Sequence, residues 1–407
     1  MTFLCKSIHS LLVIQLVLVI NYRSIDVSAW KYTSSGQVSP VEMEKIKQYL
    51  GTINKPAVKS IQSPDGDIVD CIPIDKQPAF DNPLLKNHTI QMAPSAMPTY
   101  TGGNYTTNSE VRQVWNDAGN CPDETVAIRR ITVTDVLRAG SLSQFGKKKI
   151  NYKSRTAEDQ PYDNEYAIAF LIEKQNPIYG TSATFNVWNP FVETNEESSL
   201  SHLRLSSFLD VIEAGWQVLP QLYKDNRTRL FIYWTANPIQ TAGCYDLLCS
   251  GFVQIDNRVI IGGTLAPIST YGGAQYEITI LIWKDPKSGN WWMKVQNVLV
   301  GYWPAELFTA LSFNATVVEW GGEVINTSPN GVHTSTAMGS GHFPDEGFRK
   351  ASYISNLMTV DSSNNLSLVK SITTKEDHPY CYDAKTFDED KGLILYFGGP
   401  GNNPFCP

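Results

Sequence analysis

From Tyr166 onward the chain is a succession of short segments rich in Val, Ile, Phe, Tyr and Trp, separated by Gly, Asn or Pro. Such residues favour β-strands, and no convincing helical period intervenes. Examples are YAIAFLIE, TRLFIYWTA, QYEITILIWK and TVVEWGGEVI. This pattern predicts an all-β fold, an antiparallel β-sandwich similar to a jelly roll, of about 250 residues.

The preceding part of the chain is mixed and predicts a separate α/β segment. Ser39 can cap a helix that has Pro40 in its first turn and Glu42 closing a capping box. Residues 63–95 are rich in Pro, Asp and Asn, so we expect them to be extended and wrapped on another part of the protein. Residues 129–137 alternate as a strand does.

The first 29 residues have the features of a cleaved secretory signal. An apolar run from Leu11 to Ile20 follows a short polar start, and Val27-Ser28-Ala29 resembles a signal-peptidase site. No later stretch approaches the roughly 20 apolar residues of a membrane span. We therefore expect a secreted protein with no membrane anchor after signal removal.

Six cysteines remain once the signal is removed, and an even count in an oxidising compartment indicates disulfides. Cys244 and Cys249 are close enough in sequence for a local bridge. Cys381 with Cys406 would hold the C-terminus, and Cys71 with Cys121 is a possible third pair. Candidate glycosylation sequons stand at Asn87, Asn104, Asn226, Asn314, Asn326 and Asn365.

Charge and motifs exclude several classes of protein. The net charge of −7 provides no basic surface for nucleic acid. The chain has no HExxH, P-loop, GxGxxG or GxSxG motif. The spacing of His333 and His342 fits no standard metal site, so we interpret both as loop histidines that bond to backbone. No metal and no cofactor is predicted.

Two acidic strand segments are the strongest functional signal. If residues 208–218 form a strand, Glu213 shares a face with Gly215 and Gln217. In TVVEWGGEVI, Glu319 and Glu323 share a face in the same way. Glycines flank an acid in both segments, and glycine in a strand often marks a close approach by a ligand or backbone. Exposed or salt-bridged glutamates are the alternative.

Long motifs then resemble one known family. DGDIVDCIPIDKQPAFDNPLLKNHTIQMAPS resembles the activation peptide of the neprosin family. Five further motifs resemble the catalytic domain of the same family: IEAGWQVLPQLY, GCYDLLCSGFVQ, GNWWMKV, VVEWGGEV and GGPGNNPFCP. The resemblance covers nearly everything after the signal and implies three parts: a signal peptide (1–29), a prosegment (30–158) and a catalytic domain (159–407).

The resemblance implies a glutamic endopeptidase made as a zymogen, which cleaves peptides after proline in acid. Its two catalytic glutamates correspond to Glu213 and Glu323, with Glu319 as the fallback for the second. The expected partners are a proline-containing peptide or protein substrate and the chain's own prosegment as inhibitor. The expected location is extracellular, in the cell wall or apoplast, or vacuolar.

The resemblance also implies how latency would work and where the chain departs from its family. The Pro-rich segment would block the cleft, and the basic junction, residues 146–163, would be a solvated linker cut during activation. Asp246 stands where the family would have Asn. Two alternatives remain: an inactive cell-wall or carbohydrate-binding sandwich, and a glycosidase that uses paired carboxylates.

Overall fold

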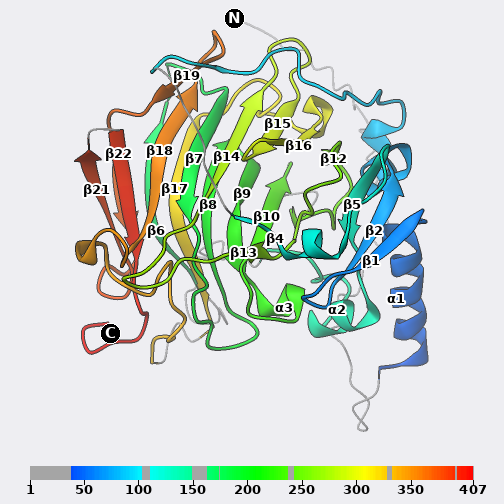
Figure 1. The fold of residues 1–407 in the computed structure, drawn as a ribbon, viewed down its shortest axis with the longest axis horizontal. Coiled ribbons are helices and arrows are strands. Elements are labelled where there is room, and N and C mark those ends of the chain that lie inside the picture. The colour runs from blue at the N-terminus through cyan, green and yellow to red at the C-terminus, as the bar shows by residue number, and fades with distance from the viewer. Residues whose placement is uncertain are drawn as a thin grey trace, which may run out of the picture.

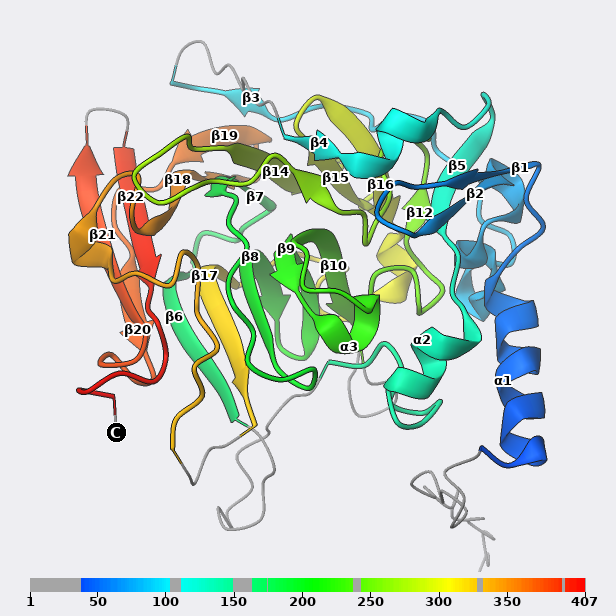
Figure 2. The same cartoon turned by 60° about the horizontal axis from the view of Figure 1, so that its bottom comes forward.

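The computed structural model describes residues 38–102, 111–148, 163–173, 175–236, 243–327, 332–389 and 392–406. Two large sheets pack face to face; the N-terminal part begins at one end of them and then runs across the second sheet to β3 (Thr99–Tyr100), beside β19 (Asn365–Leu368) (Figures 1 and 2). The predicted all-β sandwich is confirmed. Of the helices in the described part of the chain, none is both long and apolar enough to cross a membrane.

The first sheet has seven strands, and all its neighbouring strands are antiparallel. From one edge to the other they are β11 (Cys244–Tyr245), β10 (Arg229–Thr235), β9 (Asp210–Val218), β8 (Ser198–Ser207), β17 (Val317–Asn326), β6 (Asp163–Ile172) and β20 (Thr373–Glu376). Strand β8 separates β9 from β17, so the two acidic strands are next-but-one neighbours.

The second sheet has ten strands. Its main path is β12 (Val253–Gln254), β16 (Val298–Trp303), β15 (Trp291–Val295), β14 (Glu277–Lys284), β7 (Gly180–Asn186), β18 (Ser352–Val360), β19 (Asn365–Leu368) and β3 (Thr99–Tyr100). A hairpin, β21 (Asp383–Glu389) and β22 (Gly392–Gly398), extends it, with β22 also paired to β18. Tryptophans fill much of the space between the sheets, because Trp216, Trp291, Trp303 and Trp320 are fully buried there.

The N-terminal part forms its own small layer. Helix α1 (Pro40–Ile53) begins as predicted, because Ser39 Oγ accepts a hydrogen bond from the Glu42 amide at 3.2 Å. Its other elements are β1 (Lys59–Gln62), β2 (Ile68–Pro73), β4 (Arg112–Gln113), β5 (Thr125–Arg129), helix α2 (Val133–Arg138), and 3-10 turns at Ile74–Lys76, Pro78–Asp81, Pro83–Leu85 and Val114–Ala118.

The sandwich also contains short elements outside its two sheets. These are β13 (Leu265–Ala266), which pairs with β4, helix α3 (Pro220–Tyr223), and 3-10 turns at Ala305–Leu307 and Pro344–Glu346.

The strand predicted over residues 129–137 is wrong. Strand β5 ends at Arg129 and helix α2 follows. Thr132 caps that helix, and Asp135 Oδ2 accepts a hydrogen bond from the Thr132 amide at 2.7 Å. This reciprocal capping box outweighs the alternation of apolar residues, which is too short to distinguish a strand from a helix.

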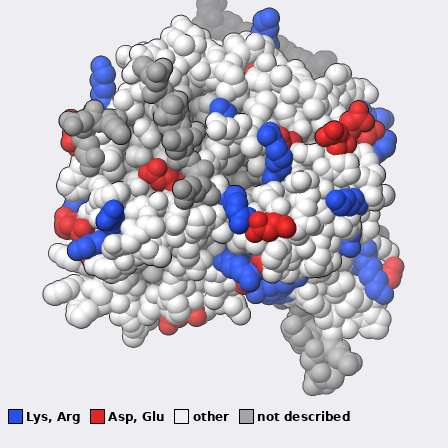
Figure 3. All heavy atoms as spheres, viewed as in Figure 1, with Lys and Arg blue, Asp and Glu red and all other residues white. Residues whose placement is uncertain are grey.

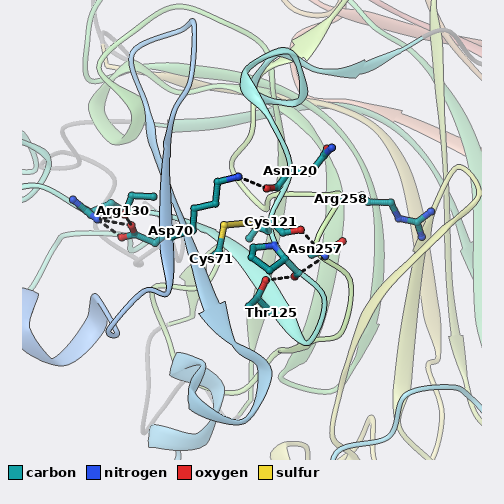
Figure 4. Close-up of a disulfide and its surroundings, with 12 residues drawn as sticks. Asp70, Cys71, Asn120, Cys121, Thr125, Arg130, Asn257 and Arg258 are labelled. Carbon is teal, nitrogen blue, oxygen red and sulfur yellow. Dashed lines mark hydrogen bonds and ion pairs between the residues drawn. A yellow bond between two sulfur atoms is a disulfide. The ribbon is translucent and has the colours of Figure 1, made fainter.

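The three predicted disulfides are all present: Cys71–Cys121, Cys244–Cys249 and Cys381–Cys406. The first closes the N-terminal layer, next to the point where Asn257 Nδ2 donates to the Cys121 carbonyl oxygen at 3.1 Å (Figure 4). That bond ties the N-terminal layer to the sandwich. On the face shown in Figure 3, acidic and basic side chains are scattered among neutral residues.

The sequons divide by accessibility. Asn87 and Asn226 are exposed, and Asn314 and Asn365 are partly exposed, so glycosylation there stays a prediction. Asn104 lies outside the described residues. Asn326 is buried, and its Nδ2 donates to Glu165 Oε1 at 2.8 Å. A glycan has no room at Asn326 in this fold, which corrects the prediction at that position.

We predict that Gly215→Ala will prevent β8 and β9 from pairing. A Cβ at Gly215 would lie 1.9 Å from the Ser201 carbonyl oxygen, so backbone would have to move. The free energy of unfolding should fall by more than about 3 kcal/mol, measured by denaturant titration of secreted protein. Gly51→Ala is the matched control, because no atom lies within 4 Å of that Cβ and Gly51 is helical. Equal stability of both variants would contradict this account.

Candidate active site

Glu213 and Glu323 project from the same face of the seven-stranded sheet. Antiparallel pairing sets Glu213 opposite Arg204 and Glu323 opposite Leu200, so both glutamates flank β8. Both are 1% exposed. The structure thus brings together the two glutamates that the sequence singles out. We call this pair the glutamate pair.

Glu319 lies on the same face of the sheet but forms an ion pair with Arg204. Its Oε2 accepts a hydrogen bond from Arg204 Nη1 at 2.8 Å. The Glu319 side chain is 19% exposed. Lys148 joins Glu213 to Glu323, whereas Glu319 pairs with Arg204, so the structure favours Glu323 over Glu319 as the partner of Glu213.

A lysine from the N-terminal part lies between the two carboxylates. Lys148 Nζ is 3.0 Å from both carboxylate oxygens of Glu213 and 2.6 Å from Glu323 Oε2. The Lys148 side chain is 5% exposed, and its ammonium also lies 5.3 Å from the centre of the Tyr233 ring. One buried cation therefore bridges both acids.

Two further side chains orient the glutamate pair. His202 Nδ1, on β8, is 2.8 Å from Glu213 Oε1 and donates to it. Asn164 Nδ2, on β6, donates to Glu323 Oε1 at 2.6 Å. Each carboxylate thus has one neutral or basic donor from a neighbouring strand in addition to Lys148, as buried carboxylates require.

The electrostatics follow from burial and these contacts. Burial alone would raise the pKa of Glu213, but Lys148 and then His202 lower it well below its ordinary value of 4.5. Burial would lower the pKa of Lys148, but the two glutamates raise it above its ordinary value. Burial and the charge of Glu323 raise the pKa of Tyr166, which lies opposite Glu323 on β6. At neutral pH the site therefore holds an ionised Glu213 and a charged lysine.

Apolar residues of the N-terminal part cover this face of the sheet. Phe145, Val136 and Ile131 pack in one cluster with Phe231 and Tyr245. A cavity of about 30 Å³ remains beside Phe145, which is room for about one water molecule. The face that carries the glutamate pair is closed to solvent.

The segment that closes the site is not the one expected from the sequence. The Pro-rich residues lie elsewhere: His88 Nε2 is 2.8 Å from the Tyr302 hydroxyl, and the Ser95 amide donates to Asp285 Oδ2 at 2.6 Å. Both partners belong to, or directly follow, strands of the second sheet. The prediction that the Pro-rich segment blocks the cleft is therefore wrong, because the covering residues come from α1 and from the chain between Ile131 and Lys148.

The basic junction also differs from a simple solvated linker at its start. Lys147 pairs with Cys244 in an isolated bridge, and Lys148 is buried in the site. Residues 149–162 lie outside the described part of the chain. The sequence showed a basic cluster there, but nothing in its spacing distinguished the one lysine that enters the site.

Asp246 lies directly after β11 and is buried in a polar network. It has a positive φ of 54°, which Asp and Asn tolerate better than most residues. The Tyr223 hydroxyl donates to Asp246 Oδ2 at 2.8 Å and itself accepts from Gln217 Nε2 at 2.8 Å. Burial raises the pKa of Asp246 to about 6, although Tyr223 and then Arg129 act in the opposite direction.

Among the described residues, three groupings have ligand atoms close enough to hold a metal ion, and one of these, His333 with Cys381 and Cys406, contains a disulfide. His202, Glu213 and Glu323 have ligand atoms within 4.8 Å of one another, but the Lys148 ammonium lies between the two carboxylates. Glu165, His333 and His378 converge in the same way on the other side of β6.

The fold and the site define a β-sandwich whose paired, buried carboxylates are covered by its own N-terminal segment. A family model described as Neprosin matches residues 195–400, and one described as Neprosin activation peptide matches residues 60–170. The first match spans half of the chain, so the chain belongs to the neprosin family. The resemblance drawn from the sequence motifs is confirmed.

Solved structures of other peptidases are similar only at a low level. A scytalido-glutamic peptidase with a peptide-based transition-state analog shows 9% identity and a TM-score of 0.33 over 58% of this chain and 98% of its own. SCP-B, a member of the Eqolisin family of peptidases in complex with the tripeptide Ala-Ile-His, shows 9% identity and a TM-score of 0.30 over the same shares. Similarities of this size carry no argument about function.

We predict that Asp246→Asn will change how stability depends on pH. A carboxyl whose pKa is raised in the folded state favours the protonated form, so wild-type stability falls as pH rises from about 4 to 6 and is lowest above that range. Asn carries no charge, so between pH 4 and pH 7 the free energy of unfolding of the variant should rise by up to about 3 kcal/mol relative to that of wild type. Denaturant unfolding of both proteins at pH 4 and pH 7 measures this difference. If the free energy of unfolding changed equally in both proteins between the two pH values, the prediction would be contradicted.

Proposed function

We propose that this chain is the zymogen of a secreted glutamic endopeptidase that is active in acid and cleaves peptide bonds after proline. The observation that carries the proposal is the bridge from one buried ammonium to both Glu213 and Glu323. A site that holds a cation between two carboxylates also holds a water molecule there once the cation leaves, since the two are of similar size. Such a water would contact both acids.

Two carboxyls close enough for one ammonium to contact both support general acid–base hydrolysis. The second ionisation is opposed by the first, so the glutamate pair shares one proton over an acid range. The ionised member takes a proton from the bound water as it attacks the scissile carbonyl. The protonated member stabilises the oxyanion and then protonates the leaving nitrogen. His202 and Asn164 hold the two carboxylates in place throughout.

A peptide substrate is supported by the polypeptide segment that covers the face of the sheet with the glutamate pair. The polypeptide from α2 to Lys148 covers the glutamate pair with main chain and apolar side chains. A carbohydrate-binding protein or a glycosidase would be expected to present a hydroxyl-binding, polar groove instead. We therefore favour the peptidase over these two alternatives. Preference for proline and secretion, with an extracellular or vacuolar location, rest on the family and the N-terminal sequence alone.

Latency follows from the same bridge. The prosegment, residues 30–158, occupies the site through Lys148 and excludes substrate. Because the pKa of Glu213 is depressed in this state, the bridge is at full strength above its ordinary value of 4.5 and weakens as pH falls below it. Acid would release the prosegment, and cleavage within residues 149–162 would make release permanent.

The test of the activity is cleavage of a proline-containing peptide at about pH 3, followed by mass spectrometry. Glu213→Gln and Glu323→Gln should each lower kcat/KM by about a thousandfold, because neither retains the acid–base pair. Each protein is assayed after an added protease has removed its prosegment.

Glu319→Gln is the matched control, since it lies on the same strand face but contacts Arg204. It should retain activity within about threefold of wild type. Turnover that survives both Glu213→Gln and Glu323→Gln, or a wild type that cleaves no peptide, would overturn the proposed function.

We predict that Lys148→Met will process itself at a higher pH than wild type. Without the ammonium, the buried carboxylates lose the cation that contacts both of them, and an unpaired buried charge costs about 3–5 kcal/mol. The variant should shed its prosegment at about pH 5–6, where wild type stays intact, as followed by gel electrophoresis over time. Glu213→Gln should not process itself at any pH.

Lys147→Met controls for loss of a neighbouring positive charge. Lys147 Nζ lies 3.0 Å from Cys244 Sγ and contacts neither glutamate in the described structure. The Lys147→Met variant should shed its prosegment at the same pH as wild type. Identical pH profiles for Lys148→Met and wild type would show that the bridge does not maintain latency.

A further inference from the structure

Three side chains converge on the side of β6 that faces away from the glutamate pair. Glu165 lies between Asn164 and Tyr166 and therefore points to the opposite face of the sheet. Its Oε2 is 2.8 Å from His333 Nε2, in the loop that follows β17, and 2.9 Å from His378 Nδ1, just after β20. We call these three residues the His–Glu cluster.

His333 faces an acceptor on each of its ring nitrogens. Nδ1 lies 2.9 Å from the Thr334 carbonyl oxygen, and Nε2 lies 2.8 Å from Glu165 Oε2. A neutral imidazole has one N–H, so it can donate to only one of these two oxygens. The Nε2–Oε2 contact therefore needs a proton, carried by the ring or by the Glu165 carboxyl, or a metal ion between the two atoms.

The surroundings match those of a metal-binding histidine. Ligating histidines usually donate their other N–H to a carbonyl or carboxylate oxygen, as His333 Nδ1 does to Thr334. Ligating carboxylates are themselves hydrogen-bonded, as Glu165 Oε1 is by Asn326 at 2.8 Å. The side chains of Glu165 and His333 are 1% and 6% exposed, whereas that of His378 is 43% exposed. An ion would enter past His378.

We propose that Glu165, His333 and His378 bind a zinc ion at neutral pH. Two imidazole nitrogens and one carboxylate oxygen are a common zinc ligand set, with water as the fourth ligand. Zinc bonds of about 2.0–2.1 Å place tetrahedral ligands roughly 3.3 Å apart, so the present 2.8 and 2.9 Å contacts would open slightly. The half-exposed His378 has room to turn.

The site is independent of the proposed peptidase activity. It lies across β6 from the glutamate pair, and the ion would join β6, the loop after β17 and the turn after β20. The nearby Cys381 and Cys406 sulfurs form a disulfide, so they supply no thiolate ligand. In the zymogen, Lys148 occupies the glutamate pair, which leaves the His–Glu cluster as the zinc site to be tested.

The experiment is a calorimetric titration of the intact, chelator-treated zymogen with ZnCl₂ at pH 7.5. Wild type should bind one zinc ion per chain, and His378→Gln should weaken binding at least about a hundredfold. His342→Gln is the matched control, because His342 Nδ1 also lies 2.8 Å from a glutamate, Glu346, and is similarly exposed at 37%. It should bind zinc as wild type does.

X-ray absorption spectroscopy of zinc-loaded wild type gives a readout that needs no variant to fold. Two imidazole nitrogens with oxygen in the remaining positions would support the site. Absence of binding at about 100 µM zinc, a spectrum with fewer than two imidazoles, or equal affinities of His378→Gln and wild type would each overturn it.

Discussion

The structure depends on one buried cation held between two buried acids. Removing Lys148, Glu213 and Glu323 from water costs several kcal/mol for each ion, and only close contacts among them offset it. The glutamate pair therefore needs a positive partner whenever the face is covered. In this structure that partner is the Lys148 ammonium. Under the proposed function a proton takes its place in acid, so that the same two carboxylates would connect latency with activation.

Sheet register is what allows a single ammonium to reach both acids. Strand β8 lies between β9 and β17, and a shift of one residue in either pairing would turn a glutamate into the tryptophan-filled core. Gly215 and Gly321 help to fix this register, because a side chain at either would collide with a carbonyl oxygen of the adjacent strand. The glycines beside the acids thus permit close strand approach rather than leaving space for substrate.

Local patterns predicted more of this molecule than long-range contacts did. Strand-forming segments, the alternation that placed Glu213 and Glu323 on sheet faces, the Ser39 cap and the Cys244–Cys249 disulfide all depend on short spacings. The buried position of Lys148 depends instead on how the prosegment docks, and adjacent lysines carry no signal of it. Thr132 and Asp135 did carry a local signal for α2, which the apolar alternation obscured.

Strand β6 connects the two charged sites of the sandwich. Successive residues point to opposite faces, so Asn164 holds Glu323 while Glu165 belongs to the His–Glu cluster. Strand β6 also pairs with β17 along ten residues, and His333 follows β17 in the chain. Any ion or proton that fastens the cluster therefore restrains the ends of both strands that set the position of Glu323. The alternation of one strand is enough to make the geometry of the glutamate pair depend on charges outside it.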